Sequence, residues 1–316
     1  MLPLETILAA TDLTDACDEV LRAAAGLARR TGAALHVIHS FDFPPAPYFD
    51  VPPDAINFQS RIDDSEAAMD AQIARVVPPD VAVAGRRLEV FAAARAIADY
   101  AAAIHASLLV MGPHTRRRLE AGFLGTTADR VIRTVEIPVL IVRGELRLPL
   151  RRVLVPVDLS ERTGCVLDVA LRWGMGLGAS DGMLPVPGVE MEIIHVVPRV
   201  LAPPGLPFDR ATVRPGINQH VEAAVARAGG ASAVQVSEEV LWGDRPDREI
   251  VRYAREAGSD LLVMATHGYG MVRRALIGST ASGVTRAVHC PVLLLPPAVW
   301  RAAPAPMDEV AHASAG

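Results

Sequence analysis

One block of sequence occurs twice in this chain. The first copy, Leu108–Arg143, reads LLVMGPHTRRRLEAGFLGTTADRVIRTVEIPVLIVR, and the second, Leu261–Pro296, reads LLVMATHGYGMVRRALIGSTASGVTRAVHCPVLLLP. Aligned without a gap, the copies pair Gly125 with Gly278. Each copy runs from an apolar strand through a glycine-containing loop into a helix, and then into a second strand that begins at proline. The repeat therefore predicts two copies of one domain within the 316 residues of the chain.

The composition excludes several classes of protein. The net charge of -5 lacks the basic excess of a dedicated nucleic-acid-binding protein. The 31 basic residues are all arginines, which excludes a P-loop because that motif places a lysine on the phosphates. The three cysteines are isolated, which favours buried single cysteines over a zinc site or a disulfide framework. Because the sequence shows neither a signal-peptide pattern nor a run of about eighteen apolar residues, we expect a soluble, cytoplasmic protein with no membrane or nucleic-acid partner.

Strand and helix patterns alternate along both halves. Each half reads β-α-β-α-β-α-β-α-β, which predicts a Rossmann-like α/β domain with a five-stranded parallel sheet and helices on both faces. The strands outside the repeated block are expected at Thr6–Ala10, Ala34–His39, Arg87–Phe91, Arg152–Val157, Glu192–Val197 and Val234–Trp242. The helices between the strands are expected at Asp15–Arg30, Ser60–Val76, Arg95–His105, Glu161–Leu177, Ala211–Ala228 and Pro246–Ala257.

The repeat also divides the chain. The expected parts are an N-terminal domain at 1–145, a linker at 146–150, a C-terminal domain at 151–297 and a disordered tail at 298–316. The final strands of the two domains, Val139–Val142 and Val292–Leu295, are apolar and would be exposed edges in isolated domains. We therefore expect them to pair within the chain as a pseudo-dimer, and a homodimer of two chains is a further possibility.

An aspartate ends the first strand of each half. Asp12 follows the first strand, and Asp158 follows the corresponding strand of the second half. Open parallel sheets bind ligands at the C-terminal ends of their strands, where Val37 or Val196 on the second strand and the glycine loop would also lie. The sequence thus predicts that three separated features of each half surround one crevice.

The loop that enters the last helix has the chemistry of an anion site. Gly278 lets the backbone approach a phosphate closely, and Ser279 and Thr280 open a helix whose free N–H groups and positive dipole end attract anions. Gly268 permits a turn with positive φ or keeps side chains out of the ligand's way, whereas the corresponding Thr115 is β-branched and disfavours positive φ. The second half is therefore the better candidate for a phosphate site.

Over essentially the whole chain apart from the tail, the sequence resembles the universal stress protein family in its tandem two-domain form. The nucleotide-binding branch of that family carries G-x2-G-x9-G-[ST]; the second half reads Ala265-x2-Gly268-x9-Gly278-Ser279 and the first Gly112-x2-Thr115-x9-Gly125-Thr126. Each half thus departs at one glycine. The resemblance implies an adenine-nucleotide α-hydrolase-like fold that binds ATP or a related adenine nucleotide, with Mg2+ or Mn2+ bridging the phosphates.

By the same resemblance, a site in the second half would draw on its first, second and fourth strands and on the loop. Its expected members are Pro156, Asp158, Val196, Met264, Ala265, His267, Gly268, Gly278, Ser279 and Thr280. A second candidate site in the first half would use Asp12, Val37, Gly112, Gly125, Thr126 and Thr127, with Ala10 in place of the proline. We expect no catalytic residue and no metal ligand from protein side chains in either set.

Plainer interpretations stay open for several of these residues. The glycines could be helix-entry residues of a fold that binds no nucleotide, and Asp12 and Asp158 could be turn residues. His36 and His195 lie in apolar strands, where a packed histidine bonded to the backbone is the more frequent role. The arginines beside the loops could neutralise phosphate or could simply be solvated; they are Arg116, Arg117, Arg118, Arg273 and Arg274.

Three functions are consistent with these patterns. The first is a stress-associated regulatory protein that binds an adenine nucleotide, chiefly in its C-terminal half, so that occupancy biases its conformation or its binding of a protein partner. The second is a structural or interaction protein of the same fold that binds no nucleotide, and the third is an adenylyl-transferring enzyme. The sequence favours the first, with any ATP hydrolysis slow and incidental, because it shows no carboxylate pair, nucleophile–base pair or metal-ligand cluster.

Overall fold

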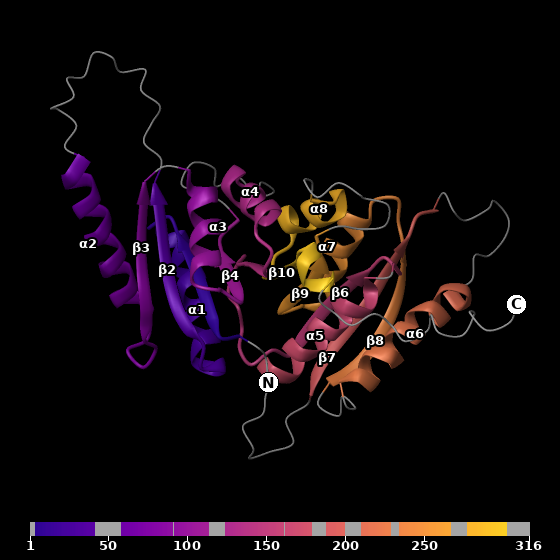
Figure 1. The fold of residues 1–316 in the computed structure, drawn as a ribbon. Coiled ribbons are helices and arrows are strands. Elements are labelled where there is room, and N and C mark those ends of the chain that lie inside the picture. The colour runs from indigo at the N-terminus through magenta and orange to yellow at the C-terminus, as the bar shows by residue number, and fades with distance from the viewer. Residues whose placement is uncertain are drawn as a thin grey trace, which may run out of the picture.

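Two similar α/β halves share one sheet in the computed structural model, which describes residues 4–41, 58–90, 92–113, 124–160, 162–178, 188–199, 210–228, 234–266 and 277–301. The described strands form a single ten-stranded sheet in the order β3-β2-β1-β4-β5-β10-β9-β6-β7-β8. Helices cover both faces of this sheet (Figure 1). The predicted α/β class, with a parallel sheet in each half, is confirmed.

The strands and the α-helices between them follow the same order in the two halves. The N-terminal half contains β1 (Thr6–Thr11), a short 3-10 helix (Asp15–Cys17), α1 (Asp18–Thr31), β2 (Ala34–Phe41), α2 (Phe58–Val76), β3 (Val83–Val90), α3 (Ala93–Ala103), β4 (Leu108–Met111), α4 (Thr126–Thr134) and β5 (Val139–Ile141). The C-terminal half contains β6 (Arg152–Val157), α5 (Thr163–Leu177), β7 (Val189–Val197), α6 (Arg210–Arg227), β8 (Val234–Trp242), α7 (Pro246–Ala257), β9 (Leu261–Ala265), α8 (Ser279–Ala287), β10 (Val292–Leu295) and α9 (Pro297–Arg301).

Most element bounds agree with the sequence patterns within two residues, and three differ by more. β3 begins at Val83 rather than Arg87, because Ala84 and Gly85 are residue types that strands disfavour and so obscure the strand pattern. β7 begins at Val189 rather than Glu192. The chain after the last strand forms α9, where we expected disorder from Ala298 onward. Within α9 the carbonyl oxygen of Val299 lies 3.8 Å from the Cys165 Sγ, which holds this turn against α5. Residues 302–316 of the expected tail lie outside the described residues.

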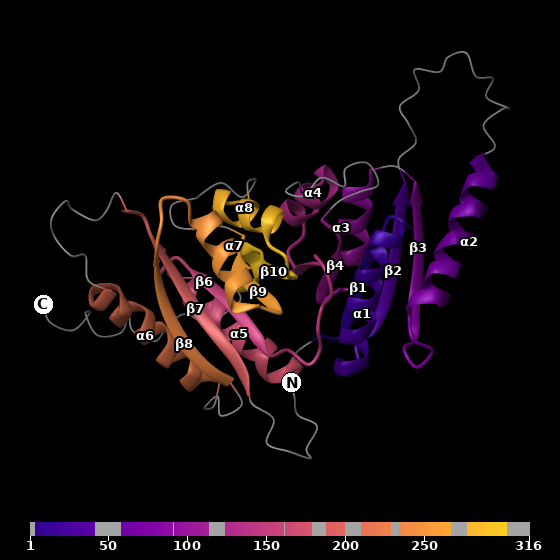
Figure 2. The same cartoon turned by 180° about the vertical axis from the view of Figure 1, so that it is seen from behind.

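Two hydrophobic cores lie on opposite faces of the sheet. One core contains Val20 of α1 together with Leu171 of α5, and the other contains Val131 of α4 together with Val284 of α8. Figures 1 and 2 show α4 beside α8 near the middle of the molecule. Each core therefore includes residues of both halves, so the halves are joined by packing as well as by the chain.

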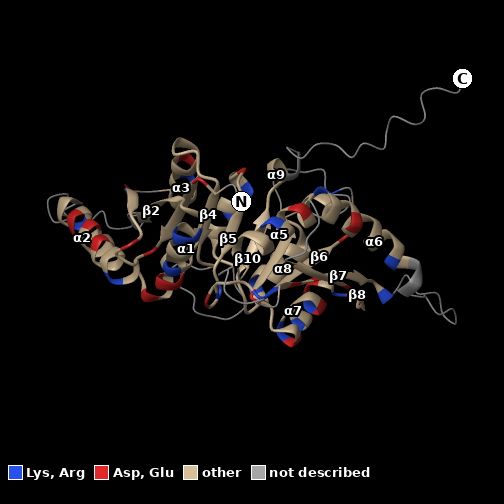
Figure 3. Ribbon diagram, turned by 90° about the horizontal axis from the view of Figure 1, so that it is seen from below, with Lys and Arg blue, Asp and Glu red and all other residues tan. Residues whose placement is uncertain are grey.

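Many charged residues lie on helices, as Figure 3 shows for α1, α2 and α7. Cys17 and Cys290 are buried, and burial raises the pKa of each thiol to about 12, as expected for inert structural cysteines. Among the described residues, no helix has both the length and the apolar character of a membrane span.

The two halves meet at β5 and β10, which pair antiparallel. Leu140 lies opposite Leu293 at this seam, and both side chains are fully buried. The predicted pairing of the final strands within one chain is confirmed. The pairing covers the strand edges that the isolated halves would expose. A second contact between the halves lies near the linker, where the Arg30 guanidinium of α1 donates to the Gly178 carbonyl oxygen at 2.5 Å.

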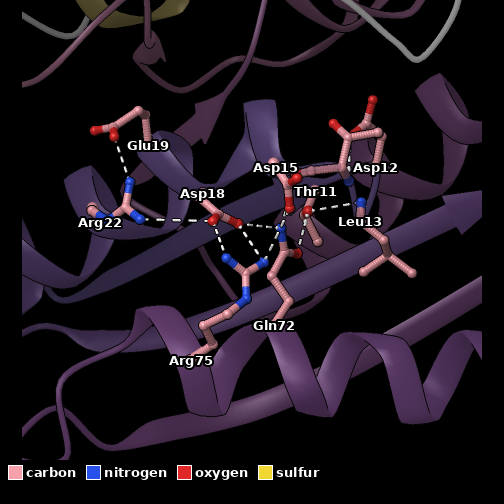
Figure 4. A network of polar contacts seen from close by, with 10 residues as sticks. Thr11, Asp12, Leu13, Asp15, Asp18, Glu19, Arg22, Gln72 and Arg75 are labelled. Carbon is pink, nitrogen blue, oxygen red and sulfur yellow. Dashed lines mark hydrogen bonds and ion pairs between the residues drawn. The ribbon is translucent and has the colours of Figure 1, made fainter.

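A buried polar network holds α2 against α1 and the end of β1 in the first half (Figure 4). The Gln72 amide accepts a hydrogen bond from Thr11 at 2.8 Å and donates to the Thr14 carbonyl at 3.0 Å and to Asp18 at 2.9 Å. Arg75 donates to both carboxylate oxygens of Asp18, and Asp18 is only 5% exposed. Burial would by itself raise the pKa of Asp18, but the hydrogen bonds from Arg75 and Gln72 outweigh it and hold the pKa below its ordinary value.

The shared cores predict cooperative unfolding of the two halves. All three tryptophans, Trp173, Trp242 and Trp300, belong to the second half, so tryptophan fluorescence reports on that half while far-ultraviolet circular dichroism reports on both. We expect coincident urea transitions by the two probes, and a Leu293→Ala loss of about 2 to 5 kcal/mol in the free energy of unfolding. Two separate transitions would show that the seam does not couple the halves.

The Gln72 network predicts a stability effect confined to one face of α2. Gln72→Leu leaves the buried polar groups around it without partners, and we expect a loss of about 1 to 3 kcal/mol in urea denaturation. Gln59 lies on the same helix but is exposed, so Gln59→Leu is the matched control and should change stability by less than about 0.5 kcal/mol. Equal effects of the two substitutions would contradict the assigned role of the network.

The lowered pKa of Asp18 predicts the direction of a pH effect. A carboxyl whose folded pKa is depressed contributes stability above its unfolded pKa of about 3.9, and the contribution is lost as the pH falls through the folded pKa. We therefore expect the stability difference between the native chain and Asp18→Asn to be greatest near neutral pH and to shrink below pH of about 4. Thermal unfolding at a series of pH values measures this difference, and a difference that grows on acidification would refute the assignment.

Candidate functional site

A cavity lies at the C-terminal ends of β6 and β9, beside the N-terminus of α8. Its volume is about 280 Å³. Every described residue predicted for the second-half site lines it: Pro156, Asp158, Val196, Met264, Ala265, Gly278, Ser279 and Thr280. The two remaining predicted members, His267 and Gly268, lie outside the described residues. The structure thus brings together residues that are more than a hundred positions apart in the chain.

The N-terminus of α8 forms one wall of this cavity. Gly278 precedes the helix with φ -56° and ψ 146°, and its N–H donates to the Thr266 carbonyl at 2.8 Å. The first hydrogen bond closing the helix runs from the Ser282 N–H to Gly278. The preceding N–H groups, at Ser279 and Thr280, are among those that a helix cannot satisfy internally. Because φ is negative at Gly278, the backbone conformation there does not itself require glycine.

Asp158 also lines this cavity, from a tight turn after β6. Its Oδ1 accepts a hydrogen bond from the Ser160 N–H at 3.1 Å, and the intervening Leu159 adopts a left-handed conformation with φ 58°. Asp12 ends β1 in the same way, with Oδ1 accepting from the Thr14 N–H at 3.0 Å. Both aspartates are therefore turn residues, and Asp158 also lines the cavity.

Pro156 explains why the hydrogen-bonded pairing of β6 with β9 stops near the cavity. The Arg152 carbonyl accepts from the Asp260 N–H of the loop before β9, so alternate residues of β6, Leu154 and Pro156 included, direct their backbone groups toward β9. Pro156 has no N–H to donate, and the described pairing of β6 with β9 ends at Leu154. In the first half, β1 stays paired with β4 through Ala10. The described β6–β9 pairing therefore stops two residues before Pro156, whereas the corresponding Ala10 still pairs with Met111 of β4.

Several cavity residues were not predicted from the sequence. Arg162 and Thr163 come from the start of α5, and Pro246 and Ile250 come from α7. Thr163 is only 2% exposed, so its wall of the cavity is closely packed. The helical spacing of Thr163 and Val166, about one turn apart on the buried face of α5, is a sequence pattern that could have predicted their inward position. Nothing in the local sequence around Arg162 distinguishes it from a solvated arginine.

The histidines of the second strands are structural. The Nδ1 of His195 lies 2.8 Å from the Val157 carbonyl, which agrees with a packed histidine bonded to the backbone. His39 makes the same contact, at 2.8 Å, with the Thr11 carbonyl. His36 instead lies 3.0 Å from the Tyr100 hydroxyl, and burial lowers its pKa.

The strand register corrects one predicted correspondence between the halves. His195 lies opposite Val157 and His39 lies opposite Thr11, so His39 rather than His36 is the counterpart of His195. Ser40, not Val37, therefore occupies the position of Val196. Val37 is fully buried in the core below the strand end. The dipeptide His-Val recurs in both strands, but a recurring dipeptide does not determine which residues pair across neighbouring strands.

The first half repeats the backbone frame of the second. Gly125 precedes α4 with φ -62° and ψ 150°, and its N–H donates to the Pro113 carbonyl at 2.7 Å. Gly112 directly follows β4, and Thr126 and Thr127 form the first turn of α4. The side chains around this frame differ, since Thr11 and Cys17 replace Val157 and Thr163, and Thr11 is bonded to Gln72. His114, Thr115 and the arginines of both loops lie outside the described residues.

Comparison with known proteins identifies relatives over most of the chain. The model of the universal stress protein family matches residues 3–143 and again 149–296. A universal stress protein of Mycobacterium tuberculosis, Rv2005c, is 29% identical over 202 residues, which cover 60% of this chain and 61% of that protein. Another, Slr1230 of Synechocystis, is 27% identical over 172 residues, covering 54% of this chain and 51% of its own length. The aligned part thus spans less than two thirds of these relatives.

Solved structures show the same fold. A universal stress protein from Archaeoglobus fulgidus superposes with a TM-score of 0.61 at 20% identity and covers 92% of this chain and 96% of its own. A putative universal stress protein from Pseudomonas aeruginosa superposes with a TM-score of 0.60 at 17% identity, covering 95% and 96%. With two family matches that follow the repeated elements of the sheet, the chain belongs to the universal stress protein family.

Proposed function

We propose that this protein is a regulatory binding module that takes ATP or a related adenine nucleotide in its C-terminal half. The observation that carries the proposal is the cavity beside α8, which gathers all the described residues expected for a nucleotide site. Occupancy of this cavity biases the conformation of the protein or its binding of a protein partner.

The phosphate end of the nucleotide lies at α8 in this proposal. Ser279 and Thr280 offer backbone N–H groups and hydroxyls at the positive end of the helix dipole. Arg162 lines the same cavity and supplies a permanent positive charge in a chain without lysine. Mg2+ or Mn2+ would add charge compensation by bridging phosphate oxygens, with no ligand required from protein side chains.

The adenine end is accommodated by the apolar part of the cavity. Pro156, Ile194, Val196 and Ile250 contribute aliphatic surface suited to a flat aromatic base. Asp158 adds a carboxylate at the same end of β6, which suits hydrogen-bond donors such as ribose hydroxyls or the base amino group. This separation of apolar and anion-binding walls favours a nucleotide over a simple anion or an apolar ligand.

The first half serves chiefly as the structural partner of the second. Its strands β1 and β4 stay paired through Ala10, and Thr11 at the end of β1 is engaged by Gln72. At the corresponding positions of the second half, Pro156 and Val157 line the cavity. A nucleotide bound in the first half, if present, would therefore be held more weakly.

A competition titration against a fluorescent ATP analogue tests the proposed site. We expect Gly278→Val and Asp158→Ala each to weaken ATP binding about tenfold or more, since each removes a close contact or a polar group of the cavity. The dihedral angles at Gly278 are allowed for valine, but Gly278 is buried, so the urea stability of the variant is measured beside its ATP affinity. Asp158→Asn keeps an oxygen for the turn with Ser160 while removing the charge, which separates ligand binding from turn stability.

The first half offers matched controls. Gly125→Val and Asp12→Ala change the corresponding positions there, and we expect ATP affinity within about twofold of the native value. Unchanged affinity in both second-half variants would overturn the site assignment. Absence of nucleotide from an acid extract of the purified protein, together with no binding in the titration, would instead favour a structural or interaction protein of the same fold.

A further inference from the structure

Arg143 links the first half to the helix that borders the cavity. It follows β5 at the end of the first half, and its Nε donates to the Thr285 carbonyl of α8 at 2.7 Å. Burial lowers the pKa of this guanidinium, which nevertheless stays charged because arginine is not deprotonated in proteins. A charged group is therefore held against a specific carbonyl across the seam between the halves.

The contact lies at the end of α8 where a positive charge is favourable. Thr285 is in the last turn of the helix Ser279–Ala287, and the last four carbonyls of a helix have no partner within it. The guanidinium satisfies one of these carbonyls and complements the negative end of the helix dipole. Inside the same helix Thr285 is itself only 1% exposed, and its hydroxyl donates to the Ala281 carbonyl at 2.7 Å.

The other end of this helix borders the cavity. With nine residues, α8 is about 13 Å long, so Arg143 and the cavity are separated by the length of one short helix. The second half cannot make the same contact with the first, because Pro296 occupies the position of Arg143 there and has no side-chain donor. The half whose strand pairing stops before Pro156 is thus the half whose last helix is held by an arginine from its neighbour.

We propose that Arg143 is a positioning residue through which the N-terminal half holds α8 in place for the phosphate group of a ligand in the C-terminal half. This inference rests on the proposed nucleotide site. It gives the first half a direct part in that site and explains why two unequal copies are retained in one chain. Because Arg143 acts on the helix that meets the phosphates, it affects phosphate-bearing ligands and leaves the nucleoside contacts unchanged.

Comparison of ATP with adenosine tests the inference. Arg143→Met keeps much of the apolar stem but removes the charge and the donor, and we expect ATP affinity to fall about fivefold while adenosine affinity is unchanged. Arg143→Lys keeps the charge and should restore most of the ATP affinity. Arg95→Met is the control, since Arg95 is exposed on α3 and is paired with Asp99. Equal losses for ATP and adenosine, or no loss for ATP, would overturn the inference.

Amide hydrogen exchange of the nucleotide-free protein supplies a second measurement that needs no ligand. We expect faster exchange of the amides in α8 in Arg143→Met than in the native chain, and no change there in Arg95→Met. Unchanged exchange in α8 would contradict the positioning role. If the native chain bound neither ATP nor adenosine, the proposed function would fail, while the exchange result would still decide whether Arg143 holds the helix.

Discussion

The antiparallel pairing of β5 with β10 is the contact on which the rest of the structure depends. It converts two parallel sheets, each with an apolar last strand, into one sheet of ten strands. Both hydrophobic cores cross this seam, and α4 and α8 come to lie near each other beside it. The seam also brings Arg143 within reach of α8. A chain that lost this pairing would expose two strand edges and would separate the candidate site from the half that supports it.

The two halves have the same backbone frame and differ in a few side chains. At the end of the first strand, Pro156 in one half corresponds to Ala10 in the other, and the pairing with the neighbouring strand stops before Pro156 but includes Ala10. The glycine before the last helix is present in both halves and has nearly the same dihedral angles. The glycine alone therefore does not distinguish a binding half from a supporting half. The halves differ instead in the strand pairing and the side chains beside that glycine.

The sequence predicted the parts of the structure that depend on periodic or repeated patterns. The alternation of strands and helices gave the fold class, and the repeat gave the correspondence of Gly125 with Gly278. The bounds of β8 and α7 agree because turn residues flank strongly patterned segments. The tail was expected to be disordered from Ala298, yet its first residues form α9 through a contact with α5 that a local pattern does not encode.

Other features of the site depend on register and packing, which a single sequence does not specify. The equivalence of Val37 with Val196 was wrong because it relied on adjacent letters rather than on the residues that pair across strands. Arg162 reaches the cavity only because α5 begins beside the turn at Asp158. The role of Arg143 requires the seam, since Thr285 is distant in sequence and belongs to the other half.

The number of ATP molecules bound per chain tests the central claim most directly, because the claim is that one half binds nucleotide and the other supports it. Equilibrium dialysis with radiolabelled ATP at saturating concentration measures this number for the native chain and for Gly278→Val. The account predicts one tightly bound ATP for each native chain and a loss of that binding in the variant. Two ATP molecules bound per chain with equal affinity, or one tightly bound ATP that is retained in Gly278→Val, would contradict it.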